Sequence, residues 1–298
     1  MNKRFANKDT GLIVATDLKT AKARTAYWIM FAFLIIASVV CLFPVVWVFM
    51  SAFKDLDEFL SVPPTIIPKT FNIKKLPEVW KLLNFQRYYL NSIWLVIGDC
   101  VCAVLFNGMF GYVLSRLKPK GVNLVFTAVF WTMLMPSTTN MIPLFMTFVN
   151  FPVIHLNLTD TYLPMWLIAG ANAYFTLLFR SAFNNISMTY VEAARMDGCT
   201  NAGIFFKIMV PLCMPTVFVV LIFSVQQAWG AFLWPYLVLK DTDMFPISLK
   251  LFELKNSGVA SDIYFVAILL AIIPPAILYC FFSKYIMGGA NVSGGIKG

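Results

Sequence analysis

The polar side chains that could take part in chemistry are few, and most of them lie inside long apolar stretches. Four of them carry an amide or an indole: Asn140, Gln226, Gln227 and Trp229. Groups of this kind can hydrogen-bond a polar solute or stack on it, so we expect these residues to line a possible substrate pathway. Amides inside a membrane also bond neighbouring helices, and Trp is common at membrane interfaces, so both interpretations stay open.

Nothing in the sequence is typical of a catalyst. There is no Gly-rich phosphate loop ending in Gly-Lys, and no His-Glu-x-x-His pair for zinc. Cys100 and Cys102 have the wrong spacing for a metal pair, and His155 is the single histidine. Asp99 is the one carboxylate well inside an apolar stretch, whereas ion-coupled transporters usually carry several. We therefore expect no enzyme and no bound metal or cofactor, and an energy source on another subunit.

The composition identifies the environment of the chain. Of its 298 residues, 60% are hydrophobic and 12% are charged, and the mean hydropathy is +0.77. Soluble chains carry about 25% charged residues, so this chain cannot cover a water-facing surface. A soluble enzyme and a nucleic-acid-binding domain are both excluded, and the chain is expected to be an integral membrane protein.

Long apolar stretches predict the membrane spans, since a bilayer core requires roughly 20 apolar residues per helix. Backbone polar groups find no partners in lipid, so the spans must be helices and the fold all-α. Six stretches qualify: Ala26–Met50, Tyr88–Ser115, Gly121–Ile154, Thr161–Phe179, Ile208–Leu239 and Ile263–Ser283.

The distribution of charge predicts the orientation. With six spans, the side that holds both termini carries 14 cations and 4 acids, while the other side carries 9 of each. Cations accumulate on the cytoplasmic side, so both termini are expected there, in a plasma membrane. The net charge of +9 is thus a topology signal and not a nucleic-acid footprint.

The predicted organisation has three parts. A cytoplasmic N-terminal segment covers 1–25, a six-helix domain covers 26–286, and a cytoplasmic tail covers 287–298. The six-helix domain includes one long cytoplasmic loop, 184–212, between the fourth and fifth spans.

This loop is expected to form two short helices joined by a turn. Ser187 can cap the first helix, Gly198 suits its C-terminal end, and Thr200 can cap a second helix that reaches Pro211.

The apolar side chains of the loop, Val191, Ile204 and Phe205 among them, are expected to have little local core. The loop would then dock into a groove on a partner. A pair of helices resting on lipid headgroups, with Glu192 paired to Arg195, is the alternative that the residues leave open.

The loop also resembles a known family. Glu192-Ala193-Ala194, Gly198, Ile208 and Pro211 are similar in type and spacing to the EAA loop of ABC importer permeases. Trp229 with Phe232-Leu233-Trp234-Pro235, and the glycine-rich tail from Gly288 on, resemble its MalG-like carbohydrate branch. The likeness covers residues 26–298.

The resemblance implies a type I ABC importer permease in a bacterial plasma membrane. Its implied partners are a second related permease, two ATPases that bind ATP and Mg²⁺, and an extracellular binding protein that delivers a carbohydrate, in particular an oligosaccharide. Contact with the ATPases is implied for these residues: Glu192, Ala193, Ala194, Asp197, Gly198, Ile208 and Pro211. The tail residues Gly294, Gly295 and Lys297 are implied to reach the ATPases too, although a solvated terminus is the simpler interpretation.

Two functions are alternatives to a carbohydrate importer permease. A permease for a polyol or glycerol phosphate would show clustered Arg or Lys in the spans, which are absent from this sequence. A secondary transporter would move its solute without ATP.

The sequence supports four further expectations about the fold. The run from Pro136 to Pro143 predicts either a broken helix that lines a cavity or a proline kink. Asp99 and Asn107 are expected to be structural or to lie at a subunit interface. Gly108, Gly111 and Ser115 share one helix face and predict close packing. The segments 53–87 and 240–260 are expected outside the membrane, where they dock the binding protein or simply pack as a cap.

Overall fold

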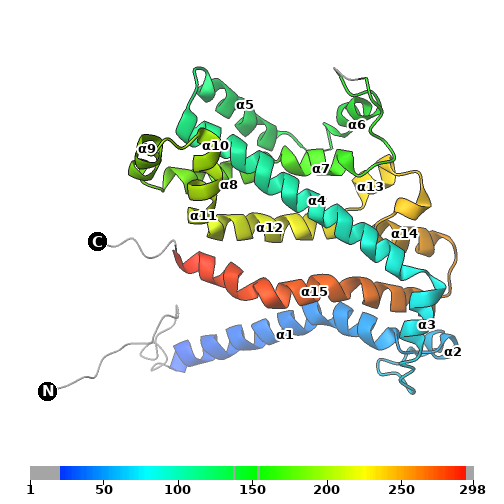
Figure 1. Cartoon of the computed structure of the whole chain (residues 1–298). Helices are drawn as coiled ribbons and strands as arrows, with labels where there is room; N and C mark the ends of the chain where they lie inside the picture. The colour runs from blue at the N-terminus through cyan, green and yellow to red at the C-terminus, as the bar shows by residue number, and fades with distance from the viewer. Residues whose placement is uncertain (1–20, 137, 153–154, 293–298) are drawn as a thin grey trace. The chain divides into compact units, whose positions relative to one another are not determined.

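The computed structural model describes residues 21–136, 138–152 and 155–292, and it is almost entirely helical (Figure 1). Within these residues the extended pairing is limited to one isolated bridge between Phe151 and Leu156. The predicted tail contacts Gly294, Gly295 and Lys297 lie outside the described residues, as does most of the segment 1–25. The chain divides into two compact units, 1–73 and 74–298.

The first unit contains one long helix and a folded loop. Helix α1 (Ala21–Ser51) is apolar, with Pro44 inside it, and it is followed by the short α2 (Leu56–Phe59). The Glu58 carboxylate holds the loop, since it accepts hydrogen bonds from Thr65 Oγ1 at 2.8 Å and from the Lys69 amide at 2.9 Å. The segment that follows the first predicted span is therefore held in its folded form by hydrogen bonds to Glu58.

The second unit is built from many helices. Its longest members are α4 (Phe85–Tyr112) and α15 (Ser261–Val292), with α12 (Met214–Trp229) between them (Figure 1). The others, in chain order, are α3 (Lys75–Leu82), α5 (Val122–Leu134), α6 (Met141–Val149), α7 (Leu163–Gly170), α8 (Ala173–Asn184), α9 (Met188–Met196), α10 (Asn201–Ile204), α11 (Val210–Leu212), α13 (Leu233–Val238) and α14 (Ile247–Asn256). Two π-helical turns, η2 (Val113–Leu117) and η3 (Phe205–Met209), extend α4 and α10, and η4 (Thr242–Met244) is a 3₁₀ turn.

Three helices are long and apolar enough to cross a membrane, namely Arg24–Ser51, Phe85–Leu117 and Ser261–Phe281. They match the first, second and sixth predicted spans. A fourth candidate, the pair Asn201–Leu212 and Met214–Trp229, is bent by 84° at its break. The helical membrane class is thus confirmed, while the count of six spans stays a prediction.

The third and fourth predicted spans are each divided in two. The third is interrupted between α5 and α6, so the expected break at Pro136–Pro143 is observed, while a cavity lined by it stays a prediction. The fourth is interrupted between α7 and α8, where the Asn172 side chain caps α8 by accepting from the Phe175 amide at 3.2 Å. An amide side chain that caps a new helix start explains why this span does not continue as one helix.

Close packing joins α4 to α8. A Cβ placed on Gly111 would lie 2.8 Å from Phe179 Cβ and 3.0 Å from the Arg180 backbone nitrogen, so only glycine fits. Buried Asn107 donates to the Ala169 carbonyl at 2.8 Å and accepts from Thr176 Oγ1 at 3.1 Å. The expected close packing and the structural role of Asn107 are both confirmed.

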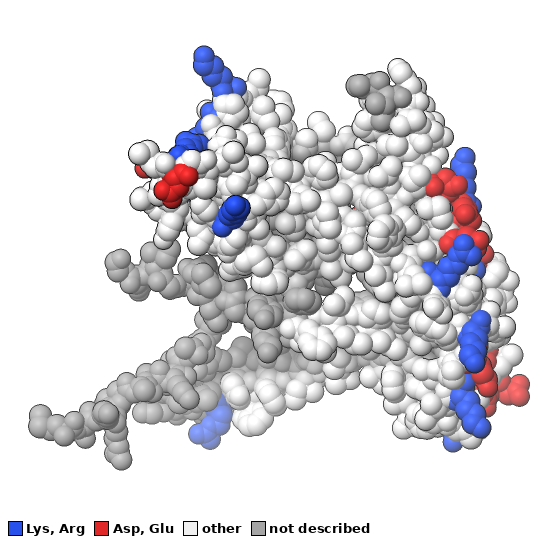
Figure 2. Space-filling model, in the orientation of Figure 1, with Lys and Arg blue, Asp and Glu red and all other residues white. Residues whose placement is uncertain are grey.

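Polar contacts hold together the end of the second unit where α4 begins, which we call the ion-pair end (residues 75–92, 155–163 and 238–262). Asp160 Oδ1 accepts from the Lys240 and Asp241 amides at 2.9 and 3.0 Å. Arg87 pairs with Asp243 at 2.9 Å, and Lys75 pairs with Asp262 at 2.6 Å. Figure 2 shows blue and red side chains gathered at this end and at the opposite end of α4, with an uncharged surface between.

Candidate functional site

The segment 184–212 folds as predicted into two short helical legs joined by a turn, which we call the elbow. The first leg is α9, and the second leg is α10 with its extension η3. Ser187 caps α9, and its hydroxyl accepts from the Thr189 amide at 3.3 Å. Gly198 adopts φ +79°, the left-handed conformation that glycine tolerates best. Thr200 caps α10 by accepting from the Gly203 amide at 3.1 Å. The local sequence therefore determines where both legs begin and where the first one ends.

The first leg has one buried face and one exposed face. Val191 and Ala194 are buried, whereas Glu192, Ala193 and Asp197 are exposed. Of the two alanines, one is part of the core and only Ala193 is free to be approached. The exposed face therefore offers two carboxylates and a small side chain.

The expectation that the elbow has little core of its own is wrong. Val191 and Ile204 are fully buried and Phe205 is 2% exposed. They belong to a hydrophobic cluster that includes Phe179, Phe183 and Met209. The expectation failed because the adjacent α8 and the distant α4 together supply a core that the loop sequence alone does not show.

Three buried aromatic rings join the second leg to its support. The ring of Phe205 lies 5.7 Å from that of Tyr112 and 6.3 Å from that of Phe183, and the last two are 6.2 Å apart. These separations are typical of favourable ring pairs. A Cβ on Gly108 would lie 3.3 Å from Phe205, so this glycine makes room for the ring. We call Tyr112, Phe183 and Phe205 the aromatic triad.

A groove of about 560 Å³ lies at the elbow. Its lining comes from both legs: Ser187, Thr189, Tyr190, Ala193, Ala194, Asp197 and Ile208. Ile208 is half-buried, and Pro211 is exposed in α11. The structure thus places Ala193, Ala194, Asp197 and Ile208 together, while Glu192 lies on the same leg outside the lining.

Glu192 remains available for a partner. It forms no ion pair with Arg195 within the part of the chain that the structure describes, where the pairs are Lys75–Asp262, Arg87–Asp243 and Lys250–Glu253. Glu192 is therefore an exposed anionic group on a surface that it shares with Ala193, Arg195 and Asp197.

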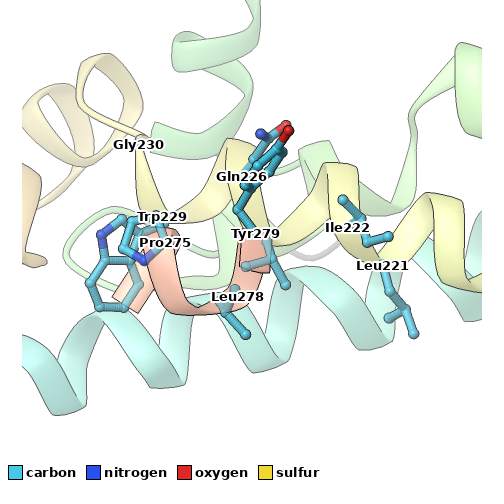
Figure 3. A pocket seen from close by; sticks show the side chains of 9 residues that line it. Leu221, Ile222, Gln226, Trp229, Gly230, Pro275, Leu278 and Tyr279 are labelled. Carbon is cyan, nitrogen blue, oxygen red and sulfur yellow. The ribbon is translucent and has the colours of Figure 1, made fainter. Parts of the chain in front are cut away.

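A second candidate site lies between α12 and α15. A pocket of about 270 Å³ is lined by Gln226 and Trp229 of α12, and by Pro275, Leu278 and Tyr279 of α15 (Figure 3). Figure 3 shows Gln226 and Tyr279 extending together from their helices. Most of the lining is aliphatic, so polar recognition in this pocket depends on Gln226 and Tyr279.

The other predicted pathway residues are not gathered in this pocket. Gln227 is exposed and outside the lining, and Asn140 is exposed at the start of α6. The N–H of Trp229 donates to the Ala271 carbonyl at 3.1 Å, and its ring contacts Tyr89 edge-on at 5.7 Å. The Trp229 N–H therefore bonds a neighbouring helix, which was the alternative to a pathway role. The Trp229 side chain also lines the pocket.

Arg116 is a residue that the sequence analysis missed. It lies in η2, and its Nη2 donates to the carbonyls of Phe183 and Ile186, at the junction between α8 and the elbow. In the sequence, Arg116 stands in a charged loop, where a cation indicates topology. Its position directly after the second predicted span is the one sequence feature that could have indicated a contact with a neighbouring helix. Asp99, by contrast, is 8% exposed, and its Oδ1 has no partner within the described residues.

Comparisons with known proteins agree on one family. The model of the family described as "Binding-protein-dependent transport system inner membrane component" matches residues 107–287. The chain is 32% identical over 263 residues to the arabinooligosaccharides transport system permease protein AraQ of Halalkalibacterium halodurans, covering 87% of this chain and 92% of the relative. It is 29% identical to the diacetylchitobiose uptake system permease protein NgcG of Streptomyces coelicolor, covering 87% of this chain and 86% of the relative.

A solved structure shares the fold. It is described as a bacterial ABC transporter involved in the import of the acidic polysaccharide alginate, and its chain superposes with a TM-score of 0.78 at 22% identity. The match covers 89% of this chain and 98% of that chain. The predicted importer permease fold is therefore confirmed.

Proposed function

This chain belongs to the family of binding-protein-dependent transport system inner membrane components, and from this premise we propose that it is the permease subunit of an importer for an oligosaccharide. Its family consists of permease subunits and not of enzymes, with ATP hydrolysis on separate subunits. The relatives named above transport arabinooligosaccharides and diacetylchitobiose, which supports a short carbohydrate chain as the solute.

The observation that carries the proposal is the elbow. A surface made of Ala193, Asp197 and Glu192 is exposed, while the opposite side of the same leg is packed into the protein core. A rigid projection of this kind can pass a push from a partner to α4 and α8, because packed helices move as bodies. We propose that the partner is an ATPase pair, and that the elbow lies in the cytoplasm with both termini.

The remaining partners follow from the same proposal. A second permease would complete the pathway, an extracellular binding protein would deliver the solute, and lipid would surround the six spans. ATP and Mg²⁺ would bind on the ATPases. Gly198, Ile208 and Pro211 would shape the elbow, and Gly294, Gly295 and Lys297 would contact the ATPases. The segments 53–87 and 240–260 would face the binding protein.

The pathway assignment is narrower than the sequence prediction. We propose that Gln226 and Trp229 contribute to it, since they line one pocket with Tyr279. Gln227 and Asn140 are retained as pathway candidates that would have to act outside that pocket.

Reconstitution tests this function. The chain would be assembled in proteoliposomes with its second permease, its ATPases and its binding protein, with arabinotriose as the probe. We expect uptake that requires ATP and the binding protein. Uptake by this chain alone without ATP would overturn the proposal in favour of a secondary transporter, and uptake of glycerol phosphate in place of any saccharide would overturn the substrate class.

The side of the membrane is tested separately. Cys199 is exposed at the turn of the elbow. A membrane-impermeant maleimide should label it in inside-out vesicles and not in intact cells. Labelling from intact cells would contradict the proposed orientation.

A further inference from the structure

Arg116 connects the first leg of the elbow to α4. Its Nη2 donates to the carbonyls of Phe183 and Ile186, and its Nη1 lies 3.5 Å from the Met188 sulfur. Phe183 is in the last turn of α8, and Met188 is the first residue of α9. One side chain of the α4 extension therefore contacts the whole junction through which α8 becomes the elbow.

The chemistry of this contact favours arginine. The last carbonyls of a helix have no partner within the helix, and they attract a cation. A guanidinium is a planar fork with several donors, so it can serve two carbonyls at once, whereas an ammonium is a single point of charge. The contact is partly buried, which protects it from competing water.

The backbone of the α4 extension determines where Arg116 lies. The turn η2 is π-helical, and it is closed by a hydrogen bond of 3.0 Å from the Lys118 amide to the Val113 carbonyl. Lys118 then leaves the helix with φ +41°. Isolated π-helical turns are often found at functional sites, because the wider turn changes the direction of the side chains that follow it.

The second leg is attached to the same helix by different means. Phe205 of η3 packs on Tyr112 of α4 and fills the space above Gly108. Both legs of the elbow are thus joined to the end of α4, one through Arg116 and the other through the aromatic triad. The second leg also continues through α11 to α12.

We propose that Arg116 is a positioning residue for energy coupling: it fixes the first leg of the elbow to α4, so that a movement of the elbow is passed to α4 as well as to α12. This inference rests on the proposed function, since it takes the elbow as the part that receives the push. Arg116 touches neither solute nor nucleotide in this mechanism. Its effect is transmitted through the backbone at residues 183–188.

The first experiment measures the elbow itself in the assembled transporter in nanodiscs. Spin labels are placed on Cys199 and on Lys120→Cys, both exposed, with the other cysteines replaced. We expect one narrow distance distribution, the same without nucleotide and with MgATP bound by a hydrolysis-deficient ATPase. Arg116→Ala should broaden it or make it depend on nucleotide. A distribution that Arg116→Ala leaves unchanged would overturn the inference.

The second experiment measures coupling. In proteoliposomes, Arg116→Ala should lower arabinotriose uptake per ATP hydrolysed by about 3- to 30-fold, the range expected for residues that transmit coupling. Arg116→Lys should restore part of this loss. Lys120→Ala removes a cation from the same loop without contacting the elbow, and it should match the wild type.

A merely structural role gives a different result. If Arg116 only stabilised the chain, Arg116→Ala would reduce the amount of assembled transporter, while uptake per ATP would stay at the wild-type value. That result would overturn the inference and leave the proposed function intact. Absence of ATP-dependent uptake in the wild-type assembly would instead overturn the proposed function.

Discussion

The two ends of the second unit are held together by different forces. At the elbow end, Phe205, Tyr112 and Phe183 are buried against one another. At the ion-pair end, α4 and the segment 155–163 are joined to the segment 239–247 by carboxylates, backbone amides and a surface ion pair. Dispersion contacts depend little on pH or salt, while exposed charge contacts depend on both. The contacts of the aromatic triad should therefore depend little on pH and salt, whereas the exposed charge contacts of the ion-pair end should depend on both.

The largest effect is expected on the exposed surface of the elbow end. Glu192→Lys reverses the charge offered to the partner, and Gly198→Pro cannot adopt φ +79°. Either change should abolish ATP-driven uptake while the chain still inserts into the membrane. Glu192→Gln is the matched control for size, and it should retain more uptake than Glu192→Lys. Wild-type uptake in both variants would remove the elbow from the mechanism.

The next effect tests the packing of the elbow end. Phe205→Ala removes a fully packed ring and should lower the free energy of unfolding by about 4 kcal/mol, within the range seen for buried Phe. Phe206 is 52% exposed and meets the Phe205 ring edge-on at 4.9 Å, so Phe206→Ala is the control and should cost much less than Phe205→Ala. Unfolding of detergent-purified chains by denaturant measures both. Equal effects of the two substitutions would show that the aromatic triad does not support the elbow.

The ion-pair end contains a buried pair and an exposed pair that can be compared directly. The Lys75 and Asp262 side chains are 9% and 12% exposed, whereas those of Arg87 and Asp243 are 48% and 52% exposed. Lys75→Ala leaves a carboxylate buried without its cation and should lower the free energy of unfolding by about 3 kcal/mol. Arg87→Ala should cost less than about 1 kcal/mol. If added salt weakens both pairs alike, the distinction between them is not supported.

The smallest effect concerns Asp160. Hydrogen bonds from the Asp241 and Lys240 amides hold the pKa of this carboxyl below its usual value. A carboxyl with a lowered pKa in the folded state stabilises the fold above its unfolded pKa of about 3.9, and the effect is lost as the pH falls through the folded pKa. The Lys240 and Asp241 amides should therefore stay protected from hydrogen exchange near neutral pH and lose protection only under acid conditions. Asp160→Ala should expose both amides at every pH, with little change elsewhere.

Sequence reasoning was successful where the signal is local. The caps at Ser187 and Thr200, the left-handed turn at Gly198 and the break before Pro143 each depend on a few neighbouring residues. It failed for Val191 and Phe205, because their core depends on how the distant α4 packs against α8 and the elbow. Arg116 was missed for the same reason, because its acceptors lie about seventy residues later.

The substrate pathway illustrates a different difficulty. Gln226, Gln227, Trp229 and Asn140 are alike in chemistry, yet only two of them line the same pocket. Residue type indicates what a side chain can bind, but the rotation of each helix about its axis decides which side chains meet. That rotation is set by packing partners such as Ala271 and Tyr89, which contact Trp229.

The glycine at position 111 has a mechanical consequence. At this one contact only a hydrogen atom separates α4 from the backbone of α8, so the two helices approach each other more closely there than any side chain would allow. Close contact of this kind leaves little room for α4 and α8 to move relative to each other at this point. A movement of α8 at this contact should therefore be felt directly by the backbone of α4, in either direction of transport.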